Sequence, residues 1–123
     1  MVEQRFIDYW KRQQQQQDVQ QEMAKQQVWI LLPVIDATLR QYGATQIFVY
    51  GSLLTDRFSE RSDIDIAVGG IPSGQFYPAL AAVNEHCDRW IDLKPLESLD
   101  PHFWERVQTR GIWIDEHTKP HPA

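Results

Sequence analysis

The sequence predicts a single α/β domain preceded by a long helical arm. Short β-rich segments at residues 47–50, 64–68 and 90–93 alternate with segments of helical pattern. The first 32 residues contain no Gly or Pro and are rich in Gln, which is a good helix former. At 123 residues the chain has the length of one domain. We therefore divide it into an N-terminal helical region (1–43), a core (46–115) and a loose tail (116–123).

The arm is predicted to be a long helix that is polar on most of its surface. Pro33 is expected either to kink this helix or to start a second one over 34–42, with Gly43 as the residue just beyond its end. A largely polar helix needs a partner or stays marginal. Phe6, Tyr9 and Trp10 therefore either form an interface with a partner or pack on this protein's own core.

The first two strands enclose the most informative segment of the chain. Residues 47–50 (Ile-Phe-Val-Tyr) have high β-propensity and predict a buried strand that ends at Gly51-Ser52. The apolar residues of 64–68 alternate with Asp63, Asp65 and Ala67, which is the period of a strand.

The remaining elements follow from patterning and from helix-end signals. A helix is expected over 75–86 and a third strand over 90–93, ending before Pro95. Asp100-Pro101 is a strong helix start, with Asp as the N-cap, and this helix should end at Gly111. Residues 112–114 are predicted to form a last strand.

Composition and charge exclude several classes of protein. The net charge of −5 argues against non-specific binding of duplex nucleic acid, so no direct DNA binding is expected. No run of 18 apolar residues and no secretory signal occurs, which predicts a cytoplasmic protein without a membrane span. Cys87 is the only cysteine, so it can form neither an intramolecular disulfide nor a cysteine-based zinc site, and we expect it to be a small buried hydrophobe. The histidines are not expected to form a metal site.

Acidic residues are arranged in a pattern that favours a divalent cation. The period of a strand places Asp63 and Asp65 on one face, where two carboxylates repel unless a counter-charge or a cation lies with them. Gly51 and Ser52, at a strand end, can expose backbone N–H groups to a phosphate. If the strand that carries Asp92 is a neighbour, three carboxylates converge and could hold two metal ions about 3.5–4 Å apart for phosphoryl chemistry.

These residues resemble a known family. The segment VYGSLLTDRFSERSDIDIAV (49–68) is similar to the signature of the minimal nucleotidyltransferase (MNT) domains of the polymerase-β superfamily: Gly-Ser, ten residues, then Asp-X-Asp. RWIDLKPLE (89–97) is similar to the segment that carries the third carboxylate. The resemblance extends over 46–114 and leaves the arm uncovered.

The resemblance implies a small nucleotidyltransferase fold, with a short mixed sheet backed by helices. It implies that Asp63, Asp65 and Asp92 bind two Mg²⁺ ions, that Asp92 also helps to deprotonate the attacking hydroxyl, and that Gly51 and Ser52 hold the β- and γ-phosphates of ATP. Proteins of this kind are commonly antitoxins that transfer AMP to a tyrosine of a HEPN ribonuclease toxin and form a hetero-oligomer with it. Two alternatives remain: a non-catalytic antitoxin that acts by binding, and a transferase that modifies a small-molecule hydroxyl.

The match departs from the family pattern shortly after Ser52. Family members often have a small residue, then Arg and Gly, where this chain has Leu54, Thr55 and Asp56. Arg57 and Arg61 either supply the positive charge for the phosphates or neutralise acidic neighbours on a solvated loop. We include Arg61 among the expected nucleotide-binding residues.

Overall fold

The structure is a computed structural model, and it describes residues 2–85 and 87–114. Its elements are, in order, α1 (Val2–Gln41), β1 (Gln46–Tyr50), the short 3₁₀ helix η1 (Gly51–Leu54), β2 (Ile64–Gly69), η2 (Ser73–Gln75), α2 (Phe76–Glu85), β3 (Ile91–Pro95), η3 (Leu96–Ser98), α3 (Pro101–Arg110) and β4 (Ile112–Trp113). The predicted tail (116–123) lies outside the described residues.

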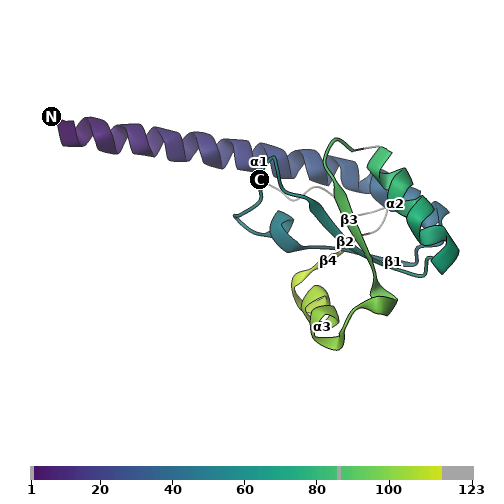
Figure 1. Cartoon of the computed structure of the whole chain (residues 1–123). Helices are drawn as coiled ribbons and strands as arrows, with labels where there is room; N and C mark the ends of the chain where they lie inside the picture. The colour runs from purple at the N-terminus through teal and green to yellow at the C-terminus, as the bar shows by residue number, and fades with distance from the viewer. Residues whose placement is uncertain (1, 86, 115–123) are drawn as a thin grey trace.

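The four described strands form one mixed sheet in the order β3-β2-β1-β4. β1 is antiparallel to β2 and to β4, whereas β2 and β3 are parallel. The predicted combination of a long N-terminal helix with a short mixed sheet backed by helices is confirmed (Figure 1).

The alternation of side chains along the strands gives the sheet two different faces. One face packs against α1 and α2 and forms the main core, which contains Ile47, Val49, Ile64, Ile66, Val68, Ile91 and Leu93 from the strands. The other face carries Phe48 and Ala67 against Val107 of α3. The same alternation puts Tyr50, Asp65, Asp92 and Lys94 on this second face, beyond the part that α3 covers. The second face therefore carries the polar residues of interest.

Helix α1 is continuous over 40 residues, and its first half projects away from the domain (Figure 1). Pro33 lies inside it, so of the two expected alternatives, a kink or a second helix starting at 34, the second was wrong. Leu32, Ile35 and Leu39 are almost completely buried, and this packing offsets the roughly 3 kcal/mol that an internal proline costs. Gly43 follows the helix end with a φ of 106°, as predicted.

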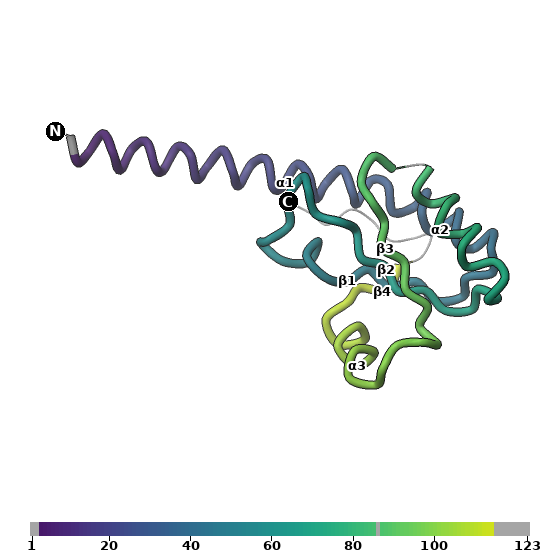
Figure 2. Tube along the Cα trace, viewed as in Figure 1, coloured from purple at the N-terminus to yellow at the C-terminus, as the bar shows by residue number. Residues whose placement is uncertain are grey.

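The aromatic residues of the arm do not pack on the core. Phe6, Tyr9 and Trp10 are between 55% and 61% exposed, so the alternative that they pack on this protein's own core was wrong. Gln21, further along α1, donates a hydrogen bond to the backbone carbonyl of Asp56, in the loop between η1 and β2. Figure 2 shows this loop reaching toward α1.

Several element boundaries differ from the sequence prediction. β3 starts at Ile91 and includes Pro95, because β3 is an edge strand of the described sheet and a proline without an N–H is tolerated there. Asp63 precedes β2 instead of lying within it. Cys87 is only partly buried against the core. The end of the helix predicted over 75–86 lies partly outside the described residues, since α2 is described to Glu85.

The start of α3 follows the predicted capping. The Asp100 side chain accepts a hydrogen bond of 2.9 Å from the backbone N–H of Phe103, and Pro101 begins the helix. The helix ends before Gly111, as expected. No described helix contains a stretch that is long and apolar enough to cross a membrane.

Candidate active site

The carboxylates of the predicted site come from two adjacent strands. In the parallel pairing of β2 with β3, Asp65 lies directly opposite Asp92. In the antiparallel pairing of β1 with β2, Asp65 also lies opposite Tyr50, the residue before Gly51. Asp63 is exposed, one residue before β2. The register thus brings Asp65, Asp92 and the end of β1 together.

Gly51 is required at its position for two separate reasons. Its φ is 79°, a left-handed conformation that residues with a Cβ rarely adopt. A Cβ built on Gly51 would overlap the Asp65 carboxylate oxygen Oδ2, and it would lie 3.1 Å from Cγ of the same side chain. The backbone turn that begins η1 therefore leaves just enough room for the Asp65 carboxylate.

Burial and like charges act on Asp65. Desolvation raises the pKa of its carboxyl group, and the charge of Asp92 raises it further, while Lys94 opposes the shift and Asp63 adds to it. The ionised form of the Asp65 carboxyl group is therefore destabilised in the protein without a bound cation. A cation placed between Asp65 and Asp92 would relieve both causes.

A lysine provides part of the missing counter-charge. Lys94 is two residues after Asp92 on the same face of β3, and its ammonium lies 2.6 Å from Asp92 Oδ2. The hydrogen bond to Asp92 raises the pKa of Lys94, so the ammonium stays protonated at neutral pH. This contact is the counter-charge that a structural role for the acids would need.

Tyr50 faces the carboxylates from the neighbouring strand. Its pKa is raised by burial first, then by Asp65 and Asp92, against the opposing effect of Lys94. Its hydroxyl oxygen is buried and makes no hydrogen bond that meets normal geometry with any residue of the described chain. A looser contact with Lys94 opposes the rise in the pKa of Tyr50 and adds to the rise in that of Lys94, so the Lys94 ammonium lies on the side of this hydroxyl.

The oxygen donors fit Mg²⁺, although the three expected acids do not form a ready metal site in the described residues. Mg²⁺ prefers carboxylate and phosphate oxygens, and Asp65 and Asp92 present such oxygens side by side. Within residues 2–85 and 87–114, no three His, Cys, Asp or Glu side chains are already grouped as metal ligands. Asp63 is exposed and precedes β2, so the expected set of three acids is not already grouped in this structure.

The backbone before Asp63 is held by Arg89, which lies in the bend just before β3. Its Nη1 donates to the backbone carbonyls of Ser59 (2.7 Å) and Ser62 (2.9 Å), and its guanidinium lies 4.8 Å from the centre of the Phe58 ring. The N–H of Ile64 donates to the carbonyl of Trp90, which continues the link into the sheet. Arg89 therefore fixes the turn that leads into Asp63, a role that the sequence analysis missed.

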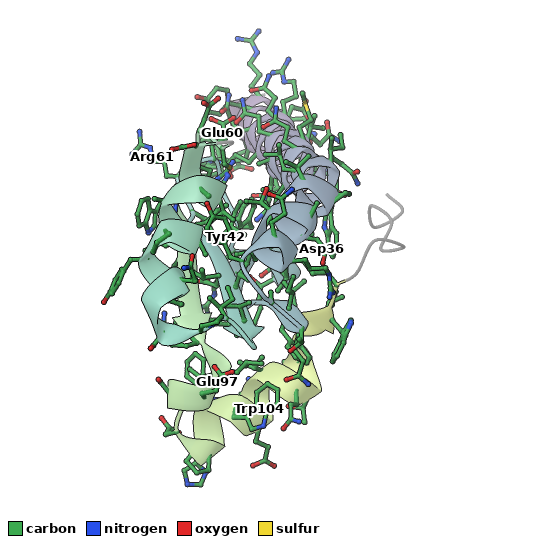
Figure 3. The ribbon with its side chains drawn as sticks, turned by 90° about the vertical axis from the view of Figure 1, so that its right-hand side faces the viewer. Asp36, Tyr42, Glu60, Arg61, Glu97 and Trp104 are labelled. Carbon is green, nitrogen blue, oxygen red and sulfur yellow. The ribbon has the colours of Figure 1, made fainter. Side chains whose placement is uncertain are left out.

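Arg61 lies on a different cavity from Gly51. It lines a hollow of about 420 Å³ between α1 and the loop 56–61, together with Gln17 and Gln21 of the arm. Figure 3 shows Glu60 and Arg61 at one end of the molecule and Trp104 of α3 at the opposite end. The role predicted for Arg61 in nucleotide binding remains a prediction.

Comparison with known proteins defines the class. Residues 34–119 match the family described as polymerase beta, nucleotidyltransferase. This match covers more than half of the chain, and the chain belongs to this family. The family resemblance of the Gly-Ser and Asp-X-Asp pattern is thereby confirmed, whereas the role of each site residue is not tested by it.

The fold is also similar to that of solved structures of toxin–antitoxin complexes and of a minimal nucleotidyltransferase. A toxin–antitoxin crystal structure with AMP-PNP is 24% identical over 66% of this chain and 68% of its own, with a TM-score of 0.56. A candidate minimal nucleotidyltransferase is 22% identical over 68% of this chain and 91% of its own, with a TM-score of 0.58. The structure of a tri-AMPylated Shewanella oneidensis HEPN toxin in complex with MNT antitoxin is 20% identical over 76% of this chain and 70% of its own, with a TM-score of 0.50. The search of curated proteins gave no match.

Proposed function

We propose that this chain is a Mg²⁺-dependent MNT antitoxin that transfers AMP from ATP to a hydroxyl, that of a tyrosine, on a partner HEPN toxin. Asp63, Asp65 and Asp92 would hold two Mg²⁺ ions, and the backbone of Gly51 and Ser52 would bind the β- and γ-phosphates. A cytoplasmic location, where ATP and Mg²⁺ are abundant, goes with this proposal.

The observation that carries the proposal is the apposition of Asp65 and Asp92 beside Gly51. Asp65 lies opposite Asp92 in the sheet, and its carboxylate fills the space that a side chain at position 51 would need. A carboxylate pressed against a left-handed glycine turn, with a second carboxylate opposite it in the sheet, is costly to fold and gains nothing obvious from packing. A bound cation would neutralise the two acids, and a phosphate chain would bind the backbone N–H groups of the Gly51 turn.

The chemistry would be an in-line displacement at the α-phosphorus of ATP. The hydroxyl oxygen of the acceptor forms a bond to this phosphorus while the bond to the bridging oxygen of the β-phosphate breaks. Pyrophosphate leaves with the bonding electrons, and the hydroxyl proton passes to the Asp92 carboxylate. Bound Mg²⁺ would supply neutralisation of the phosphate charge. Because Lys94 donates to Oδ2 of Asp92, the second oxygen, Oδ1, is the one that would serve both the metal ion and the acceptor proton.

The partner assignment draws support from the relatives. One contains a tri-AMPylated HEPN toxin with its MNT antitoxin, and another is a toxin–antitoxin structure with the ATP analogue AMP-PNP. The described residues form the family domain and the arm. A separate protein that presents its hydroxyl to the open face of the sheet would be the acceptor.

The contact between Lys94 and Asp92 favours a second candidate function. An acid paired with a lysine at 2.6 Å is satisfied without any metal. The chain could then neutralise its partner by binding alone, with a site that no longer reacts. Transfer to a small-molecule hydroxyl is the third outcome that an experiment must separate.

The test combines the purified chain, the product of the neighbouring reading frame and ATP labelled at the α-phosphate. We expect label on the partner in the presence of Mg²⁺, loss of label with Asp65→Asn, and full label with Asp88→Asn, an exposed acid on the turn before β3. Mass spectrometry of the labelled partner should give AMP on a tyrosine.

The outcomes separate the three functions. Neutralisation of the partner by Asp65→Asn without any label would support the binding antitoxin and overturn the enzyme. Label that appears only on an added small molecule, such as an aminoglycoside, would overturn the protein acceptor while keeping the reaction.

A further inference from the structure

A second cavity opens next to Gly51, on the side of η1 that faces α3. Its volume is about 630 Å³, within the range of small-molecule sites. Eight residues line it: Tyr50, Gly51, Leu54, Thr55, Phe103, Arg106, Val107 and Arg110. Gly51 therefore borders the Asp65 carboxylate and this cavity at the same time.

The cavity has one apolar wall and one basic wall. The rings of Tyr50 and Phe103 meet edge to face at 5.5 Å and form part of the apolar wall. The basic wall consists of Arg106 and Arg110, which are four residues apart and so lie on one side of α3. The Arg106 guanidinium lies 5.4 Å from the centre of the Phe103 ring, which steadies it at the cavity.

Neither arginine has an acidic partner within the described chain. The two ion pairs between described residues are Arg40–Asp36 and Lys94–Asp92, both elsewhere. Two neighbouring guanidinium groups repel each other, and here they do so in a chain with a net charge of −5. Paired arginines with free donors at a cavity are suited to an anion with several oxygens, above all a phosphate.

Acidic and basic residues both lie near Gly51. The Asp65 carboxylate occupies the space at the Gly51 Cβ position, with Asp92 opposite Asp65 in the sheet, and Arg106 and Arg110 line the cavity that Gly51 also borders. A ligand that fits both groups would carry a metal-bound phosphate next to the acids and further phosphates next to the arginines. The triphosphate of a nucleotide has this distribution of charge along its length.

We propose that Arg106 and Arg110 of α3 bind the terminal phosphates of the nucleoside triphosphate, and then the pyrophosphate that leaves. The inference rests on the proposed function, because it uses the same Gly51 turn and the same substrate. Thr55 lines this cavity at the position where members of the resembled family often have arginine. The positive charge that the loop lacks would thus come from a helix later in the chain.

The consequence for binding differs between nucleotides. A hydrogen bond to a charged group contributes about 1.5–3 kcal/mol, which corresponds to roughly 10- to 100-fold in affinity. Replacement of both arginines should therefore weaken binding of ATP and of inorganic tripolyphosphate at least tenfold. AMP has no terminal phosphates, so its affinity should change less than twofold.

The experiment is calorimetric titration of the full chain with ATP, AMP and tripolyphosphate in the presence of Mg²⁺. The variants are Arg106→Gln, Arg110→Gln and the double variant, with Arg5→Gln on the exposed arm as the matched control. Both arginines are exposed, so the variants should fold, and circular dichroism and melting temperature check this. Arg106→Lys keeps the charge but not the planar fork, and should bind tripolyphosphate with intermediate affinity.

Each result decides the question. Selective loss of ATP and tripolyphosphate binding, with AMP binding kept, supports the arginine site. Equal loss for ATP and AMP, unchanged ATP affinity in the double variant, or no binding of either polyphosphate by the unmodified chain overturns it. Because binding is measured without any acceptor, a chain that binds tripolyphosphate through these arginines but transfers no AMP would keep this inference and overturn the enzymatic function.

Discussion

Substitution of Gly51 by alanine should damage both the stability of the domain and the geometry of the site. The left-handed φ of 79° costs a residue with a Cβ about 1–2 kcal/mol. The new Cβ would also overlap the carboxylate of Asp65, whose Cγ lies 3.1 Å away, so that this side chain must turn at a further cost of about 0.5–1.5 kcal/mol. The two costs add to a loss of about 1.5–3.5 kcal/mol in the free energy of unfolding, with a central value of about 2–3 kcal/mol.

Two other glycines separate the two causes. Gly43 has a φ of 106° but no carboxylate at its Cβ position, so Gly43→Ala should show the conformational cost with only a tight contact to Pro72. Gly74 has neither a positive φ nor any atom within 4 Å of its Cβ position, so Gly74→Ala should be neutral or slightly stabilising. Urea unfolding of the three variants measures the differences, and a loss of 2–3 kcal/mol corresponds to a melting temperature lower by roughly 5–15 °C.

The contact with Asp65 is tested by a double-mutant cycle. Asp65→Ala removes the carboxylate that the new methyl group would overlap, so it should restore about 1 kcal/mol to the Gly51→Ala variant. Mg²⁺-dependent binding of ATP should fall at least tenfold in Gly51→Ala alone and stay intact in Gly74→Ala. A Gly51→Ala protein as stable as Gly74→Ala, or a cycle with no coupling energy, would refute the assignment of Gly51 to the Asp65 carboxylate.

Three further predictions concern Asp65, Arg89 and the ion pair between Arg40 and Asp36 within α1. Burial, and after it the charge of Asp92, raises the pKa of Asp65 above its ordinary 3.8. The folded state therefore binds this proton more tightly than the unfolded chain does, and stability falls as pH rises through the raised pKa. Asp65→Asn should raise the melting temperature by a few degrees at neutral pH without Mg²⁺, and an unchanged or lower value would contradict this. Arg89→Ala should weaken Mg²⁺-dependent ATP binding roughly tenfold in a titration, because the turn before Asp63 loses its two hydrogen bonds, and full affinity would show that the turn is fixed by other contacts. Arg40→Ala leaves the carboxylate of Asp36, which is 2% exposed, without its partner at 2.9 Å, and should cost about 3 kcal/mol in urea unfolding, more than Asp36→Asn; equal or negligible losses would argue against a buried charge.

The strands and helix ends of the domain could be predicted because each has a local cause. The alternation around Ile64, Ile66 and Val68 specifies a strand with one buried face, and all three are buried. The cap at Asp100 is a contact between residues three apart, so it can be seen in the sequence. Signals of this kind need no knowledge of the rest of the fold.

Features that depend on distant contacts could not be predicted in the same way. The continuity of α1 through Pro33 depends on the burial of Leu32 and Ile35 against the sheet. The position of α3 on the face that carries the acids depends on the course of the chain after β3. An amphipathic pattern says that Val107 faces a core, but it does not say which side of the sheet. The basic cavity, formed by Arg106 with Gly51, therefore had no sequence signal beyond two arginines four residues apart.

The predicted site falls between these two cases. Spacing alone brought Asp63 and Asp65 together, and the structure keeps them close enough for Asp63 to raise the pKa of Asp65. Asp92 lies opposite Asp65 only because β2 and β3 are parallel neighbours with this register. Tyr50 belongs to the site by the same register in β1, and a strand residue two positions before Ser52 gave no reason to single it out.

The electrostatics of the second face of the sheet connect the two parts of the proposed site. Burial, and after it the charge of Asp92, raises the pKa of Asp65, and the cation that opposes this shift, Lys94, is already paired with Asp92. At the cavity that Gly51 borders, Arg106 and Arg110 have no acidic partner among the described residues. These arginines do not pair with Asp65, since the ion pairs between described residues are Arg40–Asp36 and Lys94–Asp92. A ligand that is cationic toward the acids and anionic toward the arginines is therefore the arrangement that removes both costs, and a metal-bound triphosphate is such a ligand.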